Sequence, residues 1–302
     1  MVFFECGLSA LFAPVQQSLS RILQYSAFFV PQPVRFFRLA CPRQMDLHLA
    51  SGGISGHGRS MSVQPGHLYI VPTPIGNLRD ITLRAQDTLA AVDLIACEDT
   101  RHSGVLLAHL GIRRPLVSLH EHNEAMRTAQ FLKELAEGKC IAYISDAGMP
   151  GISDPGQRLV AACRRAGLPV EVLPGPSAVL TALIGSGFPG DSFYFGGFLP
   201  VKSGQRQRVL EAALDADETS VFFESPHRLE STLALLAKLA PDKLICVARE
   251  LTKKFEEYRR GPGAEVAAHY TAHPAKGEIC LVIAGSSLPK WAAGATLEVP
   301  GE

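Results

Sequence analysis

The residues most suggestive of chemistry lie between Ser145 and Gly156, where the sequence reads SDAGMPGISDPG. This segment holds three glycines, two prolines and the carboxylates of Asp146 and Asp154. It follows an apolar run at 140–144, which is typical of a buried strand, and precedes an amphipathic helical pattern. Glycine and proline alone are equally consistent with a plain turn. The length of the loop and its two carboxylates favour a ligand site, because most loops between a strand and a helix are short.

A second loop of the same kind follows one helix and one strand later. Asp154 is predicted to cap the helix, with Pro155 as its first residue and Gly167 just past its end. The strand at 169–173 then leads into the turn 174–178. A strand, a helix and a strand in this order form a parallel unit, so we expect both loops at the carboxyl ends of neighbouring strands, where open α/β sheets bind ligands. The two loops are therefore predicted to form walls of one pocket.

Strand and helix patterns alternate from about residue 66 onward, which predicts an α/β fold with a mostly parallel sheet covered on both faces. Strands are predicted at 68–71, 94–97, 116–119, 140–144 and 169–173. A second set, richer in aromatic residues, is predicted at 193–195, 221–223, 244–248 and 279–284. A stretch rich in glycine and proline separates the two sets at 176–190. We therefore expect two α/β domains, residues 66–178 and 179–286, followed by a loose tail at 287–302.

The first 60 residues differ in composition from the rest, with five arginines, no lysine and only two acidic residues. Translation beginning at Met61 explains this most simply, and a targeting leader is the alternative. The longest apolar run is interrupted by Glu5 and Pro14, so it is too short to span a membrane. We expect residues 1–65 to be a poorly ordered leader outside the fold.

Composition limits the classes of partner and compartment. The 29 basic and 29 acidic side chains give a formal net charge of zero, so a nucleic acid would have to bind a local basic patch. The seven cysteines form no CxxC pair and lie mostly inside apolar runs. We expect them to be buried in a reducing compartment, without disulfides and without a zinc site.

Eight motifs, in chain order, resemble those of the tetrapyrrole methylase superfamily. They occupy residues 68–78, 98–101, 145–156, 174–178, 197–200, 223–229, 248–253 and 277–285. Within the superfamily they are similar to the enzymes that methylate a cytidine 2′-hydroxyl of 16S rRNA in the small ribosomal subunit. The resemblance implies a cytoplasmic methyltransferase of two α/β domains, with S-adenosylmethionine bound in the cleft between them, and usually a homodimer without membrane attachment.

The same resemblance assigns residues to the cofactor. Those that it places there are Pro74, Ser145, Asp146, Ala147, Gly148, Met149, Pro150, Gly151, Pro174, Ser177 and Ala178. A carboxylate at Asp146 would favour the cofactor's positive charge, and the alternative is a cap for a turn or helix. Ser177 would either contact the cofactor or cap the next helix. The sequence contains no GxGxxG after a strand and no GxxxxGK[ST], so a dinucleotide or triphosphate fingerprint is missing.

The reaction that the resemblance implies moves a methyl group from a sulfonium to an oxygen, without a metal. The protein must align the reactants, exclude water and help to remove the hydroxyl proton. The candidate residues for this work are Glu98, Arg101, Glu224 and Arg228. Each of the two arginines would either hold a phosphate or pair with a nearby carboxylate. No general base is assigned from the sequence.

Two basic clusters are predicted to contact RNA, one comprising Lys202, Arg206 and Arg208 and the other containing Lys253 and Lys254. The alternative for both is a solvated surface. Two other functions stay open. A precorrin or porphyrin methylase would use the same fold, although such enzymes typically carry Gly-Asp-Pro where this chain has Ser-Asp-Ala at 145–147. The other is a protein that binds RNA or an adenosyl ligand without catalysis.

Overall fold

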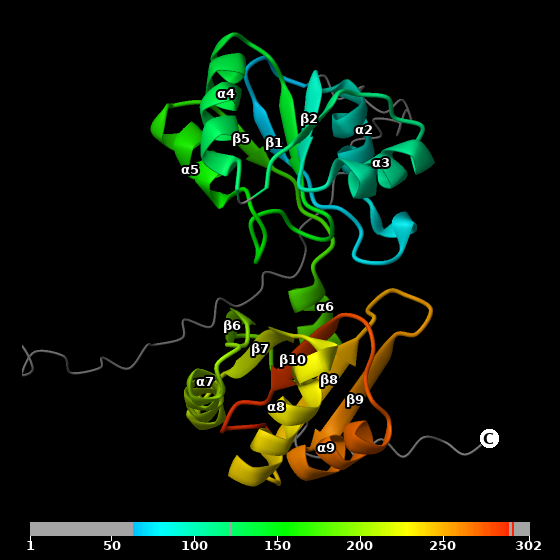
Figure 1. Ribbon diagram of the computed structural model, residues 1–302, viewed down its shortest axis with the longest axis vertical. Helices are drawn as coiled ribbons and strands as arrows, with labels where there is room; N and C mark the ends of the chain where they lie inside the picture. Colours follow the sequence, from blue (N-terminus) through cyan, green and yellow to red (C-terminus); the bar gives the residue numbers. More distant parts are fainter. Residues whose placement is uncertain (1–62, 121, 290–291, 293–302) are drawn as a thin grey trace, which may run out of the picture. The chain divides into compact units, whose positions relative to one another are not determined.

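The computed structural model describes residues 63–120, 122–289 and 292 of the chain (Figure 1). The expectations for the leader and for most of the tail fall outside these residues. Within them, no helix is long and apolar enough to cross a membrane.

The first half of the described chain builds a parallel sheet with helices on both faces. Its strands are β1 (Leu68–Ile70), β2 (Leu94–Cys97), β3 (Leu116–Ser118), β4 (Ile141–Ile144) and β5 (Val170–Val172), in the order β3-β2-β4-β1-β5. All of its strand pairs are parallel. Every residue of β1, β2 and β4 is buried, as expected for the central strands of a parallel sheet. The predicted parallel sheet is confirmed for this half.

Four helices cover this sheet, after the short 3₁₀ turn η1 (Leu78–Asp80). Helices α2 (Leu83–Ala91) and α3 (Thr100–His109) pack on one face, where Leu89 and Leu107 join the core. Helices α4 (Glu124–Ala136) and α5 (Gln157–Arg165) cover the other face through Phe131 and Leu159 (Figure 1). Both faces of the sheet are thus removed from water, and its loops are the parts left to bind a ligand.

The prediction that β4 and β5 are neighbours is wrong. Strand β1 lies between them, pairing Leu68 with Ile141 on one side and with Val170 on the other. The apolar pattern reports that a strand is buried, but it does not report which strands lie beside it. As a consequence, the loop after β1 lies between the two loops that were expected to be adjacent.

The predicted start of α5 is also wrong. The helix begins at Gln157 with Gly156 as its N-cap, two residues later than an Asp154 cap would place it. The Tyr143 hydroxyl donates to the Pro155 carbonyl (2.9 Å), and the buried Glu124 carboxylate accepts from the Gly156 amide (3.1 Å). Because Glu124 supplies the acceptor from a distant helix, Asp154 is left free for another role.

The second half builds a mixed sheet. Its strands are β6 (Phe193–Phe198), β7 (Thr219–Glu224), β8 (Leu244–Arg249), β9 (Glu257–Pro262) and β10 (Ile279–Ile283), in the order β6-β7-β10-β8-β9. Only the β6–β7 pair is parallel among them. Strand β9 was not predicted from the sequence, because its half-buried, charged residues were read as part of a basic cluster.

The second sheet also packs helices on both faces. Helices α7 (Ser203–Asp215), α8 (Pro226–Leu239) and α9 (Gly263–Ala272) share one core with it. Helix α6 (Ala178–Gly185) packs on the other face, in a core that also contains Ile75 and Leu251. The predicted α/β class with two sheets is confirmed, whereas the predicted domain boundary at 178/179 stays a prediction. The five cysteines among the described residues are free and buried, as predicted.

Replacing Gly156 by alanine should destabilise the protein. Its φ of +117° is disfavoured for residues with a side chain, and a Cβ there would overlap the Tyr143 ring. We expect the free energy of unfolding to fall by about 2–4 kcal/mol, measured by urea denaturation. The control is Gly204→Ala in α7, where a Cβ meets nothing within 4 Å; this change should be neutral or slightly stabilising. Equal losses in both variants would contradict the explanation.

Candidate functional site

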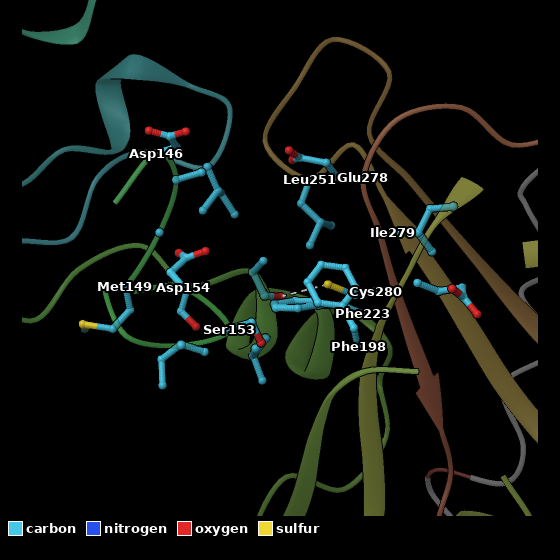
Figure 2. Close-up of a pocket in the computed structure, with 18 of the residues that line it drawn as sticks. Asp146, Met149, Ser153, Asp154, Phe198, Phe223, Leu251, Glu278, Ile279 and Cys280 are labelled. Carbon is cyan, nitrogen blue, oxygen red and sulfur yellow. Dashed lines mark hydrogen bonds between the residues drawn. The ribbon is translucent and has the colours of Figure 1, made fainter. Parts of the chain in front are cut away.

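A cavity of about 510 Å³ is lined by loops of the first sheet and by strands and turns of the second (Figure 2). Strand ends of the first sheet contribute Ile75, Glu98, Asp146–Met149 and Ile152–Asp154, and the start of α6 contributes Ser177–Val179. The second sheet contributes Phe198, Phe223–Pro226, Ala248, Leu251 and Gly277–Cys280. This volume lies within the range of roughly 300–1,000 Å³ that is usual for small-molecule sites.

The loop after β4 is held by the loop after β1. Thr73 and Gly148 exchange two backbone hydrogen bonds of 2.9 and 3.0 Å, and the Thr73 hydroxyl donates to the Ser145 carbonyl. Ser145 is itself buried, and its hydroxyl oxygen lies 3.4 Å from both the Ala147 and the Gly148 carbonyl oxygens. Gly148 has a φ of +78°, so glycine suits this position. The backbone at 146–149 is therefore fixed along the cavity wall.

The polar part of the lining is acidic. Five acidic residues line it, namely Glu98, Asp146, Asp154, Glu224 and Glu278, and no lysine or arginine does. Two of the five are paired with basic side chains outside the lining, Glu224 with Arg228 and Glu278 with Lys253. Asp146 accepts a hydrogen bond from the Asp99 amide (3.2 Å). A cavity with this lining favours a cationic ligand and opposes a polyphosphate or other polyanion.

Burial and mutual repulsion perturb two of these carboxylates. Burial raises the pKa of Glu98, and the negative charge of Asp146 raises it further. Burial, followed by repulsion from Glu98, raises the pKa of Asp154 to about 6, although a hydrogen bond from Ser145 opposes the change. Perturbed acids that gather in a cavity are typical of functional sites. Asp154 is thus ionised at neutral pH and protonated in mild acid.

Glu224 and Arg228 form a buried network on the second sheet. Their ion pair is 2.7 Å long, and the Glu224 side chain is inaccessible to solvent. The Glu224 carboxylate also accepts from the Ser225 amide and the Thr232 hydroxyl, both at 2.7 Å. Arg228 donates its other terminal nitrogen to the Leu199 carbonyl (3.1 Å). Of the two roles considered for Arg228, the ion pair is therefore the one that the structure contains.

The structure brings together part of the set of residues that the sequence singled out. The cavity is lined by Glu98, Asp146, Ala147, Gly148, Met149, Ser177, Ala178 and Glu224 from that set. Ser177 accepts from the Leu180 amide as the N-cap of α6. Ser145 braces the loop from within, and Arg228 reaches the site only through Glu224. The roles of all these residues stay predictions.

Other predicted residues lie outside the lining. Pro74, Pro150 and Gly151 are buried elsewhere in the loops, and Pro174 is exposed. The Arg101 side chain is 90% exposed and pairs with Asp99 at 2.8 Å. That pairing holds the pKa of the Asp99 carboxyl at about 2.

The predicted RNA-contacting residues differ in accessibility. Lys202 and Arg208 are exposed on the turn and helix after β6, whereas Arg206 is only 8% exposed and donates to Ser231. Lys253 is paired with Glu250 (3.0 Å) and Glu278 (2.9 Å). Lys254 is exposed, with its ammonium 5.4 Å from the centre of the Phe255 ring.

Sequence reasoning missed several residues of the lining. Asp154 was assigned to a helix cap, and Phe198, Phe223 and Glu278 lay inside motifs without receiving a role. Figure 2 shows Asp146, Met149 and Asp154 on one side of the cavity, with Phe223, Leu251 and Ile279 on the other. A repeated Ser-Asp pair at 145–146 and 153–154 was the available signal for Asp154.

Comparison with known proteins identifies the family of this chain. Residues 67–267 match the family of Tetrapyrrole (Corrin/Porphyrin) Methylases. The chain belongs to the tetrapyrrole methylase family. The superfamily predicted from the eight motifs is thereby confirmed.

The chain is also similar to named relatives and to a solved structure. The chain is 50% identical over 223 residues to "Ribosomal RNA small subunit methyltransferase I" of Synechocystis sp.. The match covers 74% of this chain and 80% of the relative. It is 48% identical to the protein of the same name from Thermotoga maritima, over 73% of this chain and 99% of the relative. The crystal structure of diphthine synthase superposes with a TM-score of 0.61 at 12% identity, covering 75% of this chain and 92% of the other. That last likeness concerns the fold alone.

Replacing Asp154 by asparagine should stabilise the protein at neutral pH. The folded state binds this proton more tightly than the unfolded chain, since the pKa rises from 3.8 to about 6. The ionised carboxylate therefore lowers stability as the pH rises through this range. After allowance for solvent screening we expect a gain of about 1 kcal/mol for the asparagine variant at pH 8, or roughly 2–4 °C in Tm.

The gain should shrink as the pH falls below about 6 and disappear below 3.8, where the carboxyl is protonated in the unfolded chain as well. Thermal unfolding at pH 8 and near pH 3.5 measures the difference. Asp191→Asn removes an exposed carboxyl and is the control, which should change Tm at neither pH. An Asp154→Asn variant that is no more stable than wild type at pH 8 would show that the ionised Asp154 carboxylate does not destabilise the folded protein.

Proposed function

We propose that this protein transfers a methyl group from S-adenosylmethionine to a cytidine 2′-hydroxyl of 16S rRNA in the small ribosomal subunit. The observation that carries the proposal is a cavity lined by three carboxylates without an ion pair among the described residues, Glu98, Asp146 and Asp154, in a chain about 50% identical to proteins named for methylation of small-subunit rRNA. Sequence motifs, fold and cavity chemistry all support it.

The cavity suits this cofactor in size and charge. S-adenosylmethionine carries a sulfonium and an ammonium, and carboxylates that lack basic neighbours stabilise such charges. Asp146, which forms no ion pair with another described residue, would face the positively charged groups, and the backbone at Ala147–Met149 approaches closely because Gly148 has no side chain. Ile279, Leu251 and Phe223 supply apolar surface for an adenosyl group. When bound, the cofactor supplies an electrophilic methyl group with a neutral thioether as its leaving group.

The protein must also receive the hydroxyl proton. We assign this role to Asp154, which lines the cavity and has a pKa raised to about 6. A base of this pKa is ionised at neutral pH and still accepts a proton more readily than an ordinary aspartate. Glu98 lies near enough to Asp154 to raise its pKa by repulsion. Glu224 is paired with Arg228 and accepts a hydrogen bond from Thr232, which suits it to stabilise the local structure rather than to accept the hydroxyl proton.

The acidic lining argues against a tetrapyrrole substrate. Precorrins and porphyrins carry several carboxylates, and the three lining carboxylates that form no ion pair with another described residue, Glu98, Asp146 and Asp154, would repel them. A neutral ribose hydroxyl meets no such repulsion, provided that the phosphates of the RNA stay outside the cavity. We propose that Lys202, Arg208 and Lys254, which are exposed, contact those phosphates.

We also propose that the protein acts in the cytoplasm as a homodimer. Leu180 and Ile184 are four residues apart on α6, so they lie on the same face of the helix, and they are 52% and 73% exposed. Such a pair of exposed apolar side chains supports an interface with a second copy.

The test is methyl transfer from labelled S-adenosylmethionine to small ribosomal subunits from cells that lack this protein. We expect label in 16S rRNA, recovered after digestion as 2′-O-methylcytidine, and none in tetrapyrroles. Asp154→Asn should keep cofactor affinity within about threefold and lose at least 10²-fold in turnover, as expected for removal of a general base.

Asp191→Asn is the matched control and should transfer methyl groups at the wild-type rate. Protein that binds the cofactor but labels tetrapyrroles instead of RNA would establish the precorrin alternative. Protein that binds RNA and cofactor but labels nothing would establish the non-catalytic alternative.

Replacing Lys254 by alanine should weaken binding of the ribosomal subunit. A lysine that contacts phosphate contributes one released counterion, so the slope of log affinity against log salt should fall by about 0.7–1. The measurement is subunit affinity at several salt concentrations. Lys133→Ala on α4 removes an exposed lysine that pairs with Glu137 and should leave the slope unchanged. An unchanged slope for Lys254→Ala would place the RNA elsewhere.

A further inference from the structure

Phe198 combines two properties that rarely occur together. It lines the cavity, yet 60% of its surface is exposed. Large aromatic side chains normally bury most of their area, and a single exposed one on a surface needs no explanation. An exposed ring at the edge of a candidate active site does need an explanation, because the fold places it there.

A β-bulge directs Phe198 to the cavity. In the β6–β7 ladder Phe195 pairs with Val221 and Phe198 pairs with Phe223, so β6 has one residue more than β7 between these pairs. Side chains alternate along a strand, and without the extra residue Phe198 would face away from Phe195. The bulge returns it to the same side, where the Phe195 and Phe198 rings lie 5.1 and 5.3 Å from the Phe223 ring. Bulges beside active sites commonly redirect a side chain in this way.

Two glycines make this bulge possible. A Cβ on Gly196 would overlap the Phe222 ring, and Gly197 has a φ of +66°, which favours glycine. The strand beyond the bulge is fixed again at Leu199. Its amide donates to the Phe223 carbonyl (3.1 Å), and its carbonyl accepts from Arg228. The ring of Phe198 is thus presented from a rigid support.

We propose that Phe198 is a stacking platform for a nucleobase of the RNA, the base of the nucleotide whose ribose is methylated. The inference rests on the proposed function. A 2′-hydroxyl reaches an enclosed site only if its nucleotide leaves the stack, and the freed base then needs a new surface. An exposed aromatic ring provides that surface for any base. Phosphates are repelled by the acidic lining, so the base and ribose are the parts of RNA that this edge accepts.

The adenine of the cofactor is the other nucleobase available to this ring. The exposure of Phe198 favours the RNA, because a cofactor enclosed by the cavity would take the more buried surfaces of Leu251 and Ile279, which are 6% and 4% exposed. In Figure 2 Phe198 lies next to Phe223, across from Asp146 and Met149 of the first sheet.

The experiment compares Phe198→Ala, Phe198→Leu and Phe198→Tyr in the full chain. Cofactor affinity is measured by calorimetry, and kcat/KM is measured with small ribosomal subunits at saturating cofactor. We expect alanine and leucine to lower kcat/KM about tenfold or more, and tyrosine to restore it to within about threefold, because only tyrosine keeps a stacking ring. Cofactor affinity should change by less than about twofold in all three variants. Tyr194→Ala, which removes a 51% exposed ring of the same strand outside the cavity lining, is the control and should retain wild-type kinetics.

Three results would overturn the proposal. If leucine restores activity as well as tyrosine, the contact is merely apolar. If the alanine variant loses cofactor affinity in step with activity, the ring binds the adenine of the cofactor. If no variant changes kcat/KM, Phe198 contacts neither base. A wild-type protein that binds cofactor but does not methylate the subunit would instead refute the proposed function, and this inference would fall with it.

Discussion

The reciprocal hydrogen bonds between Thr73 and Gly148 are the constraint on which the site depends. They join the loop after β1 to the loop after β4, at 2.9 and 3.0 Å, and thereby fix the backbone that carries Asp146. They exist because β1 lies beside β4 in the sheet. The order of the strands thus determines the position of the Asp146 loop through two backbone hydrogen bonds. The buried Thr73 hydroxyl adds a third hydrogen bond, to the Ser145 carbonyl. These bonds offset the conformational entropy that a loop so rich in glycine loses on folding.

Negative charge is concentrated where that loop faces the cavity, and this concentration has an energetic cost. Burial and the charge of Asp146 raise the pKa of Glu98, and burial and the charge of Glu98 raise the pKa of Asp154, so the folded protein holds ionised groups that would be more stable in water. A surface carboxylate of the same chain forms an ion pair with a neighbouring basic side chain, as Asp99 does with Arg101. In the lining, Glu224 and Glu278 are likewise paired with Arg228 and Lys253, whereas Glu98, Asp146 and Asp154 form no ion pair with another described residue, which leaves their charge available to a ligand. Carboxylates that destabilise the folded protein in this way are characteristic of functional sites.

The sequence predicted the elements better than their arrangement. Apolar runs placed β1, β2 and β4 within one residue, because fully buried strands have an unmistakable pattern. The neighbours of β1 could not be predicted, since a buried strand has the same apolar pattern whichever strands lie beside it. Asp154 was assigned to the helix because Asp-Pro is a good helix start locally. The acceptor that replaces it, Glu124, lies 32 residues before Gly156 in the chain. Motif reasoning found the loop of Asp146 but missed Phe198, whose orientation depends on a register shift that no pattern of hydrophobicity contains.

The buried pair of Glu224 and Arg228 is better explained by positioning than by stability. Removing two charges from water costs more than their attraction usually returns, so a pair of apolar side chains would serve stability at least as well. This pair does something that apolar side chains cannot do. Arg228 donates one terminal nitrogen to Glu224 and the other to the Leu199 carbonyl. These bonds link α8 to the chain just beyond the bulge of β6. Glu224 in turn is held by the Ser225 amide and the Thr232 hydroxyl, so its carboxylate has fixed partners on each oxygen. The geometry of the second sheet at the cavity therefore rests on a directional network, as the geometry of the first rests on the bonds of Thr73.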